Sequence, residues 1–286
     1  MSIEIVNITK QFGKTTALDG INLTIEEGQI CGLLGNNGAG KTTLFRLIAN
    51  HIFPSQGNIL VDGEEVWDND SILGKMFLVS EGTLYPESMK VKDGFRSAAT
   101  FYPHFDMERA HQLSEMFQLP LKKKISGLST GYATIYKLVL ALSVNTPYLL
   151  LDEPVLGLDA SHRDLFYRLL VEKVAEYPCT VLLSTHLIQE AAPLVEQTVI
   201  IQDGRIVRDG LKDQLLEEWS IITGPSSKMD EWATGKTLIG KSHLGGLATA
   251  YLKGAQKRED LPLGFTQERL TLQDYFILLT NGGMES

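Results

Sequence analysis

The segment Gly35–Thr42, GNNGAGKT, gathers residue types that bind phosphate. Its spacing matches G-x-x-x-x-G-K-[ST], the P-loop pattern. In such a loop successive backbone N–H groups form an anion-binding nest at the N-terminus of a helix. We therefore expect Lys41 to reach the β- and γ-phosphates of a nucleotide and the Thr42 hydroxyl to bind Mg²⁺. Thr43 is expected to hold the α-phosphate.

Glycine at three positions of this loop is part of the prediction. A side chain at Gly35, Gly38 or Gly40 would block the phosphate or forbid the backbone angles that the loop needs. The flanking residues favour the same motif, because 28–34 is typical of a buried strand and 41–52 of an amphipathic helix. Strand, loop and helix in this order are the context that the motif requires, which a simple glycine-rich turn would not explain.

A second candidate segment is Tyr148–Pro154, YLLLDEP, an apolar strand that ends in two carboxylates. Asp152 could bind the Mg²⁺ that Thr42 binds, and Glu153 could accept a proton from a water aligned on the γ-phosphate. Surface acids at a strand end are the alternative, and the P-loop upstream disfavours it. His186 follows another apolar strand, 180–184. By itself it could be an ordinary loop residue, but beside a γ-phosphate it could contact both phosphate and water.

Composition excludes several other classes of protein. The 286 residues are 43% hydrophobic and 21% charged, as in ordinary globular proteins, and the net charge of −9 disfavours a general nucleic-acid binder. Cys31 and Cys179 are expected to be buried free thiols, and the absence of a CxxC pair disfavours a zinc site. We find no signal peptide and no apolar run of roughly 18 residues, the length needed to span a bilayer. We therefore expect any function in a membrane to depend on other chains.

The order of patterns predicts an α/β fold: a P-loop NTPase core with a mainly parallel sheet, an antiparallel β subdomain, an all-helical insert and a small α+β C-terminal domain. Hairpin turns are expected at Asp62-Gly63 and at 203–204. The predicted domains are 1–217, with the helical insert at about 85–145, and 218–286. In the second domain we expect a turn cluster over 220–235, strands over 236–254 and a closing helix capped at Gly282 or Gly283.

At these residues the chain resembles the ATPase subunits of ABC transporters, over about residues 2–217. The resemblance rests on several motifs in the family's order. They are Walker A (Gly35, Asn36, Asn37, Gly38, Ala39, Gly40, Lys41, Thr42), the signature (Leu128–Tyr132, LSTGY), Walker B with its glutamate (Tyr148–Pro154), the D-loop (Gly157–Ala160) and the switch histidine, His186. Phe12 occupies the position at which the family stacks an aromatic ring on adenine.

The resemblance implies an enzyme that hydrolyses Mg-ATP between two ATPase subunits. Ser129 and Gly131 of one chain, with Asp159 of the D-loop, would complete the nucleotide site of the other. The implied partners are transmembrane permease subunits and a second ATPase subunit, in a homodimer or a heterodimer, with no nucleic acid. The implied location is cytoplasmic, on the inner face of the cell membrane. FYPHFD, LSTGY and LLLDEPVLGLDA are most similar to Gram-positive exporter ATPases with ABC-2-type membrane subunits, often linked to cell-envelope antibiotics, so export is expected.

Two departures from the family pattern affect the expected site. Thr130 replaces a glycine and Tyr132 replaces the glutamine of the signature, which could slow turnover. Glu81 stands where the family's Q-loop has a glutamine. A carboxylate there can still bind Mg²⁺, so Glu81 joins Thr42 and Asp152 as a candidate metal ligand.

Other functions within the same superfamily stay open at this stage. An ATPase of DNA repair or chromosome organisation would usually carry a long coiled-coil insert or zinc modules, and neither pattern is present. A tandem translation-factor ATPase would need two ATPase domains. Glu153 and His186 disfavour a slow regulatory or non-catalytic ATP-binding subunit, while Thr130 and Glu81 leave this alternative open.

Overall fold

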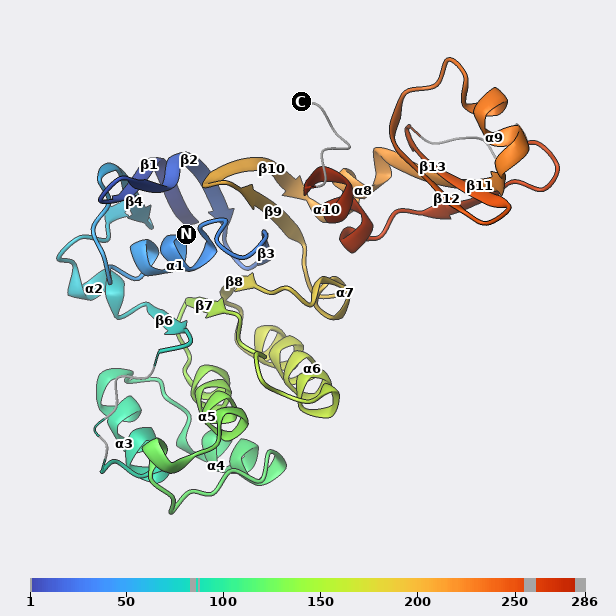
Figure 1. Cartoon of the computed structure of the whole chain (residues 1–286). Helices are drawn as coiled ribbons and strands as arrows, with labels where there is room; N and C mark the ends of the chain where they lie inside the picture. The colour runs from blue at the N-terminus through green and yellow to red at the C-terminus, as the bar shows by residue number, and fades with distance from the viewer. Residues whose placement is uncertain (1, 83–85, 87, 255–260, 281–286) are drawn as a thin grey trace. The chain divides into compact units, whose positions relative to one another are not determined.

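The computed structural model describes residues 2–82, 86, 88–254 and 261–280. The chain divides into two compact units, Met1–Asp209 and Gly210–Ser286 (Figure 1). Among the described residues the first unit contains two sheets and the second contains one.

The first unit begins with an antiparallel sheet in the order β2-β1-β4-β5. Its strands are β1 (Ser2–Phe12), β2 (Thr15–Glu26), β4 (Gln56–Val61) and β5 (Glu64–Glu65). The predicted turn between β4 and β5 is confirmed, since Asp62 and Gly63 have φ of 56° and 80°, the left-handed pair of a type I′ turn. The Asp62 carboxylate accepts hydrogen bonds from Lys75 Nζ, at 2.7 Å, and from the Tyr148 hydroxyl. This turn therefore ties the antiparallel sheet to the main sheet.

The main sheet has six strands in the order β10-β9-β3-β8-β7-β6. They are β3 (Ile30–Leu34), β6 (Met76–Val79), β7 (Tyr148–Asp152), β8 (Thr180–Ser184), β9 (Gln197–Gln202) and β10 (Arg205–Leu211). The pairs β9–β3, β3–β8, β8–β7 and β7–β6 are parallel, which confirms the predicted α/β fold. Every residue of β3, β7 and β8 is buried, as expected for strands covered on both faces. Their carboxyl ends consequently meet at one edge of the sheet.

Helix α1 (Lys41–Ile48) follows β3 and is shorter than the predicted 41–52. It ends because Asn50 takes a left-handed conformation with φ of 54°, a common way to close a helix. Ile52 is apolar but packs against the core from the turn that follows. Because Ile52 continues the helical spacing of the apolar residues in α1, the sequence pattern predicted a longer helix than the structure has.

Three helices come between β6 and β7: α3 (Val91–Phe101), α4 (Met107–Met116) and α5 (Thr130–Ser143), with a short 3₁₀ turn at Ile125–Gly127 (Figure 1). Asp106 caps α4 by accepting a hydrogen bond from the Arg109 amide at 2.8 Å. The remaining helices of this unit are α2 (Asp70–Leu73), α6 (Ala160–Glu176) and α7 (Ile188–Ala191). Phe95 and Tyr136 stack between α3 and α5 at 5.7 Å, so aromatic packing holds the helices together.

The second unit contains an antiparallel sheet in the order β12-β13-β11-β14. Its elements are α8 (Lys212–Glu217), β11 (Trp219–Pro225), α9 (Ser226–Ala233), β12 (Leu238–Leu244), β13 (Leu247–Lys253), β14 (Thr266–Arg269) and α10 (Leu272–Thr280). The expected turn cluster over 220–235 was wrong, because this segment forms β11 and α9. Gly224 and Pro225, which suggested a turn, end the strand, while Ile222 and Met229 are buried in the unit's core.

Three other predictions concern single features of the chain. Cys31 and Cys179 are buried free thiols, as expected. The predicted caps Gly282 and Gly283 lie outside the described residues. Within the described part of the chain, no helix is both long and apolar enough to span a bilayer.

Candidate functional site

The P-loop connects the carboxyl end of β3 to α1, as the sequence predicted. At Gly35 an added Cβ would lie 2.6 Å from the Ile201 carbonyl oxygen, and at Gly40 it would lie 2.8 Å from the Ala17 carbonyl oxygen. Gly40 also has φ of 111°. Gly38 differs, because its φ is 84° but no atom of the described residues lies within 4 Å of an added Cβ. Close packing inside the protein therefore requires glycine at positions 35 and 40. At position 38 glycine is required only by the left-handed backbone angle.

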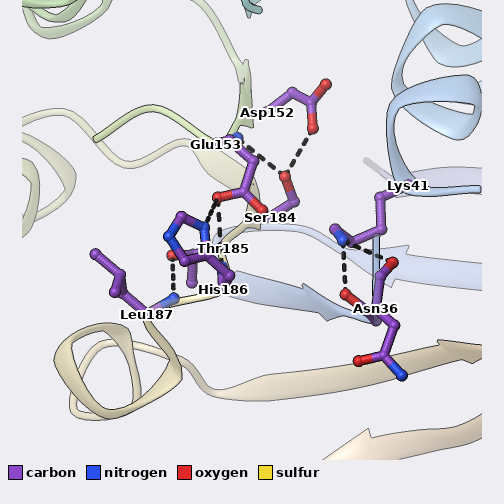
Figure 2. A network of polar contacts seen from close by, with 9 residues as sticks. Asn36, Lys41, Asp152, Glu153, Ser184, Thr185, His186 and Leu187 are labelled. Atoms are coloured by element: carbon purple, nitrogen blue, oxygen red, sulfur yellow. Dashed lines mark hydrogen bonds and ion pairs between the residues drawn. The ribbon is translucent and has the colours of Figure 1, made fainter. Parts of the chain in front are cut away.

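Lys41 is 7% exposed and bends back into the loop. Its Nζ donates hydrogen bonds to the Gly35 carbonyl, at 2.6 Å, and to the Asn36 carbonyl, at 3.3 Å (Figure 2). Burial lowers the pKa of Lys41, while the negative charges of Glu153 and Asp152 act in the opposite direction. The loop therefore holds a positive charge beside the free N–H groups of the first turn of α1, where an anion is favoured.

Two cavities lie against this loop. The smaller, of about 190 Å³, is lined by the loop itself and one acid: Ala17, Asn37, Gly38, Gly40, Lys41, Thr42, Thr43 and Glu153. The larger, of about 780 Å³, is also lined by Thr42 and extends to Glu81, Asp152, Glu153 and His186. Residues from the ends of β3, β6, β7 and β8 are thus brought to one edge of the sheet, where open α/β sheets bind ligands.

Ser184 connects the two acids at the end of β7. It is the last residue of β8 and lies opposite Asp152 in the parallel register. Its hydroxyl donates to Asp152 Oδ1, at 2.8 Å, and accepts from the Glu153 amide, at 3.0 Å (Figure 2). Ser184 was not among the predicted site residues, although a serine that ends a largely apolar strand two residues before a histidine was a usable signal. Because Ser184 is fully buried, one hydroxyl fixes both Asp152 and the backbone of Glu153.

Glu153 has a left-handed backbone with φ of 49°, which a residue other than glycine adopts only at a cost. Its Oε2 lies 2.8 Å from Nδ1 of His186 and 3.3 Å from the His186 amide nitrogen (Figure 2). The Leu187 amide donates to the Thr185 hydroxyl, at 3.0 Å, which shapes the turn around the histidine. The structure therefore places the two predicted catalytic side chains in direct contact.

The predicted signature residues begin α5. The Ser129 hydroxyl caps the helix by accepting a hydrogen bond from the Tyr132 amide, at 3.4 Å. A Cβ added to Gly131 would lie 3.4 Å from the Gly157 carbonyl oxygen, so signature and D-loop are neighbours within this chain. Asp159 caps α6, and its Oδ2 lies 2.8 Å from His162 Nδ1.

Four predicted nucleotide-binding residues are not gathered around Lys41. Within the described residues, neither cavity is lined by Phe12, Ser129, Gly131 or Asp159. Phe12 is half exposed at the end of β1, and Nζ of Lys10 lies 4.9 Å from the centroid of its ring.

The oxygen donors at this edge suit a hard cation. Thr42, Glu81 and Asp152 all line the larger cavity, and hydroxyl and carboxylate oxygens are the ligands that Mg²⁺ takes. No group of three or more His, Cys, Asp or Glu residues that could hold a metal occurs among the residues described. The set of one hydroxyl and two carboxylates, from Thr42, Glu81 and Asp152, fits Mg²⁺, which proteins usually bind through one or two carboxylates together with substrate phosphates.

Comparison with known proteins agrees with this arrangement. Residues 18–156 match the family model described as "ABC transporter". The chain is 32% identical over 217 residues to the ABC transporter ATP-binding protein YtrB of Bacillus subtilis, covering 76% of this chain and 74% of that one. It is 31% identical over 290 residues to the sulfate/thiosulfate import ATP-binding protein CysA of Pseudomonas putida, covering 96% and 88%.

Solved structures agree as well. A dimeric ATP-binding cassette, described as a post-hydrolysis state bound to ADP and phosphate, is 25% identical with a TM-score of 0.64, over 73% of this chain and 98% of that one. An ATP-binding subunit of an ABC transporter, 24% identical, has the same fold with a TM-score of 0.69, over 75% and 92%. The chain therefore belongs to the ATP-binding subunits of ABC transporters, ATPases whose activity is coupled to transport.

Proposed function

We propose that this chain hydrolyses Mg-ATP at the edge formed by β3, β7 and β8, with Glu153 as the general base. The observation that supports this most strongly is the network in which Ser184 fixes Asp152 and the Glu153 backbone while His186 contacts the Glu153 carboxylate. A carboxylate held by its backbone and by a neighbouring imidazole can accept the proton of an attacking water as its oxygen bonds to the γ-phosphorus, while the bond from that phosphorus to the bridging oxygen breaks and ADP leaves.

The P-loop would bind the phosphates of ATP. Backbone N–H groups of Gly38–Thr43 and the Lys41 ammonium supply positive potential in the smaller cavity, and the Thr43 hydroxyl lines the same space. For Lys41 to reach a phosphate, its Nζ would exchange the Gly35 and Asn36 carbonyls for phosphate oxygens. The carbonyl contacts keep this buried cation partnered until the nucleotide arrives.

Thr42, Asp152 and Glu81 are the proposed Mg²⁺ ligands. The bound ion would neutralise charge on the β- and γ-phosphates of ATP. Asp152 is 6% exposed and already oriented by Ser184, so it is the best fixed of the three. Glu81 is exposed, and its carboxylate would supply the outer ligand from the β6 side.

A second ATPase subunit would complete the site. Ser129, Gly131 and Asp159 line neither of the two cavities beside the P-loop, so in our proposal they serve the nucleotide of the partner chain. One relative of known structure is a dimer, which supports this arrangement. Bound ATP would then favour the closed pair and hydrolysis would release it. The half-exposed ring of Phe12 would stack on adenine.

The closing motion would be passed to transmembrane permease subunits, with this chain on the cytoplasmic face of the membrane. The direction of transport stays a prediction. Export is what the similarity of three segments to Gram-positive exporters implies, whereas CysA of Pseudomonas putida and OsmV of Salmonella typhimurium are import proteins by name.

Glu153→Gln tests the proposal in the purified full-length chain. We expect ATP binding to persist, turnover to fall by roughly 10²–10⁴-fold, the range for loss of a general base, and an ATP-dependent dimer to accumulate. Steady-state phosphate release and light scattering after size exclusion measure the two effects. Wild-type turnover would show that Glu153 is not the base. A monomer at every ATP concentration would contradict the homodimer and require a different ATPase partner.

A further inference from the structure

Lys137 makes two short hydrogen bonds that the proposed mechanism does not use. It lies on α5, the helix that is capped by the signature residue Ser129. Its Nζ donates to the carbonyl oxygens of Ser80 and Glu81, each at 2.7 Å. These carbonyls belong to the segment that leaves the carboxyl end of β6. A single ammonium therefore joins a helix of the insert to the segment that carries a proposed metal ligand.

The position of Lys137 explains why these bonds are strong. The side chain is half buried and lines the larger cavity together with Thr42 and Asp152. Burial lowers the pKa of Lys137, and the negative charge of Glu81 acts in the opposite direction. Hydrogen bonds from a charged donor are shorter and stronger than those between neutral groups, so the two carbonyls are held firmly.

A second contact attaches α5 to the neighbouring loop. The Thr134 hydroxyl donates to the Leu156 carbonyl, at 3.0 Å, in the segment that follows Glu153. Strands β6 and β7 are adjacent and parallel, so the segments after them leave the sheet at the same edge. Helix α5 therefore binds both segments, one through Lys137 and the other through Thr134.

We propose that Lys137 is a positioning residue for ATP hydrolysis: it fixes the Ser80–Glu81 backbone beside Thr42 and Asp152 and joins it to the helix that carries Ser129. Lys137 acts through these carbonyls and needs no contact with the nucleotide. The inference rests on the proposed roles of Glu81 and Ser129, and it adds a fixed link between the metal side of one site and the signature that serves the partner's site.

The test compares Lys137→Met with Lys122→Met in the full-length chain. Both changes remove one positive charge, but Lys122 is an exposed lysine of the helical insert. We expect K137M to lower kcat for ATP about tenfold to a hundredfold, the effect of losing bonds to a charged donor, with KM for ATP changed less than about threefold. Lys137→Arg keeps charge and donors and should restore most of kcat. K122M should match the wild type.

Amide hydrogen exchange supplies a readout besides turnover. Without Lys137 the backbone of 77–82 should exchange faster in K137M, and not in K122M. If K137M does not fold, Lys137→Gln replaces it in the test, because glutamine keeps N–H donors without the charge. We expect it to lower kcat and to speed exchange of 77–82 by smaller amounts. Wild-type kcat in K137M, or an equal loss in K122M, would overturn the inference.

Glu81→Gln separates this inference from the proposed metal site. If its ATPase rate depends on free Mg²⁺ as the wild type does, Glu81 is not a metal ligand and that part of the proposed function fails. The loss of kcat in K137M is measured independently and decides the role of Lys137. The two proposals therefore fail through different measurements.

Discussion

Glu153 and His186 contact each other through Oε2 and Nδ1, 2.8 Å apart, although they are separated by a helix and a strand in the sequence. The contact joins the loop after β7 to the loop after β8. In our proposal the imidazole holds the carboxylate that accepts the proton of the attacking water, and we expect it also to contact the γ-phosphate, as the sequence suggested. The following predictions test this site.

His186→Gln should lower kcat by roughly 10²–10³-fold, because Glu153 loses the contact that orients it and the phosphate loses a hydrogen-bond donor. ATP affinity should change little, since the P-loop residues are untouched. His111→Gln is the matched control, because His111 is exposed on α4 in the helical insert. Phosphate release and equilibrium binding of a fluorescent ATP analogue measure the two quantities. Equal rates in the two variants would remove His186 from the mechanism.

Ser184→Ala should lower both stability and turnover. The buried Asp152 carboxylate loses its donor and the Glu153 amide loses an acceptor, at a cost of about 1–3 kcal/mol in the free energy of unfolding. Ser143→Ala is the control: Ser143 is equally buried, but its hydroxyl has no hydrogen-bond partner among the residues that the structure describes. We expect S143A to be neutral or stabilising. Urea unfolding of both variants provides the comparison, and a smaller loss in S184A than in S143A would contradict the network.

Gly40→Ala should disrupt the P-loop much more than Gly38→Ala. At position 40 a methyl group would lie 2.6 Å from Leu18 Cδ2 and 2.8 Å from the Ala17 carbonyl oxygen, whereas at position 38 no described residue places an atom within 4 Å of it. Both residues have left-handed backbones, so G38A should still lose about 1–2 kcal/mol. G40A should lose more and should also bind ATP poorly. Thermal unfolding with and without ATP tests this order, and the reverse order would show that the loop is built differently.

Lys41→Met should abolish most ATP binding while leaving the fold intact. Its ammonium is the buried positive charge of the smaller cavity, and methionine keeps the length of the side chain without the charge. We expect ATP affinity to fall at least about tenfold, as is typical when one charged partner of a phosphate is removed. Calorimetric titration with ATP measures the loss. Unchanged affinity would mean that another residue binds the phosphates.

The sequence predicted the site best where a short motif fixes chemistry and geometry together. Gly35, Lys41 and Asp152 could be found from spacing, because a phosphate loop and an acid-ended strand tolerate few alternatives. Ser184 and Lys137 could not. Their roles depend on which strand lies beside β7 and which helix reaches the end of β6, and neither neighbour follows from local pattern.

The fold, too, could be predicted where a local pattern is decisive and was missed where it is not. Buried parallel strands were predicted because each is a continuous apolar run, and the hairpins because Asp-Gly pairs favour left-handed turns. Strand β11 was missed because Gly224 and Pro225 near its end resembled a turn. The end of α1 was missed because Asn50, which closes the helix, is a weaker local signal than the apolar residue after it.

The turn at Asp62 has a consequence for how the first unit unfolds. Tyr148, the first residue of β7, is fully buried and donates its hydroxyl to Asp62, and burial together with this contact raises the pKa of the phenol so that it stays protonated. Lys75 binds the same carboxylate. Separating the antiparallel sheet from the main sheet would leave the buried Tyr148 hydroxyl without its hydrogen-bond acceptor. We therefore expect the two sheets to unfold in one cooperative transition.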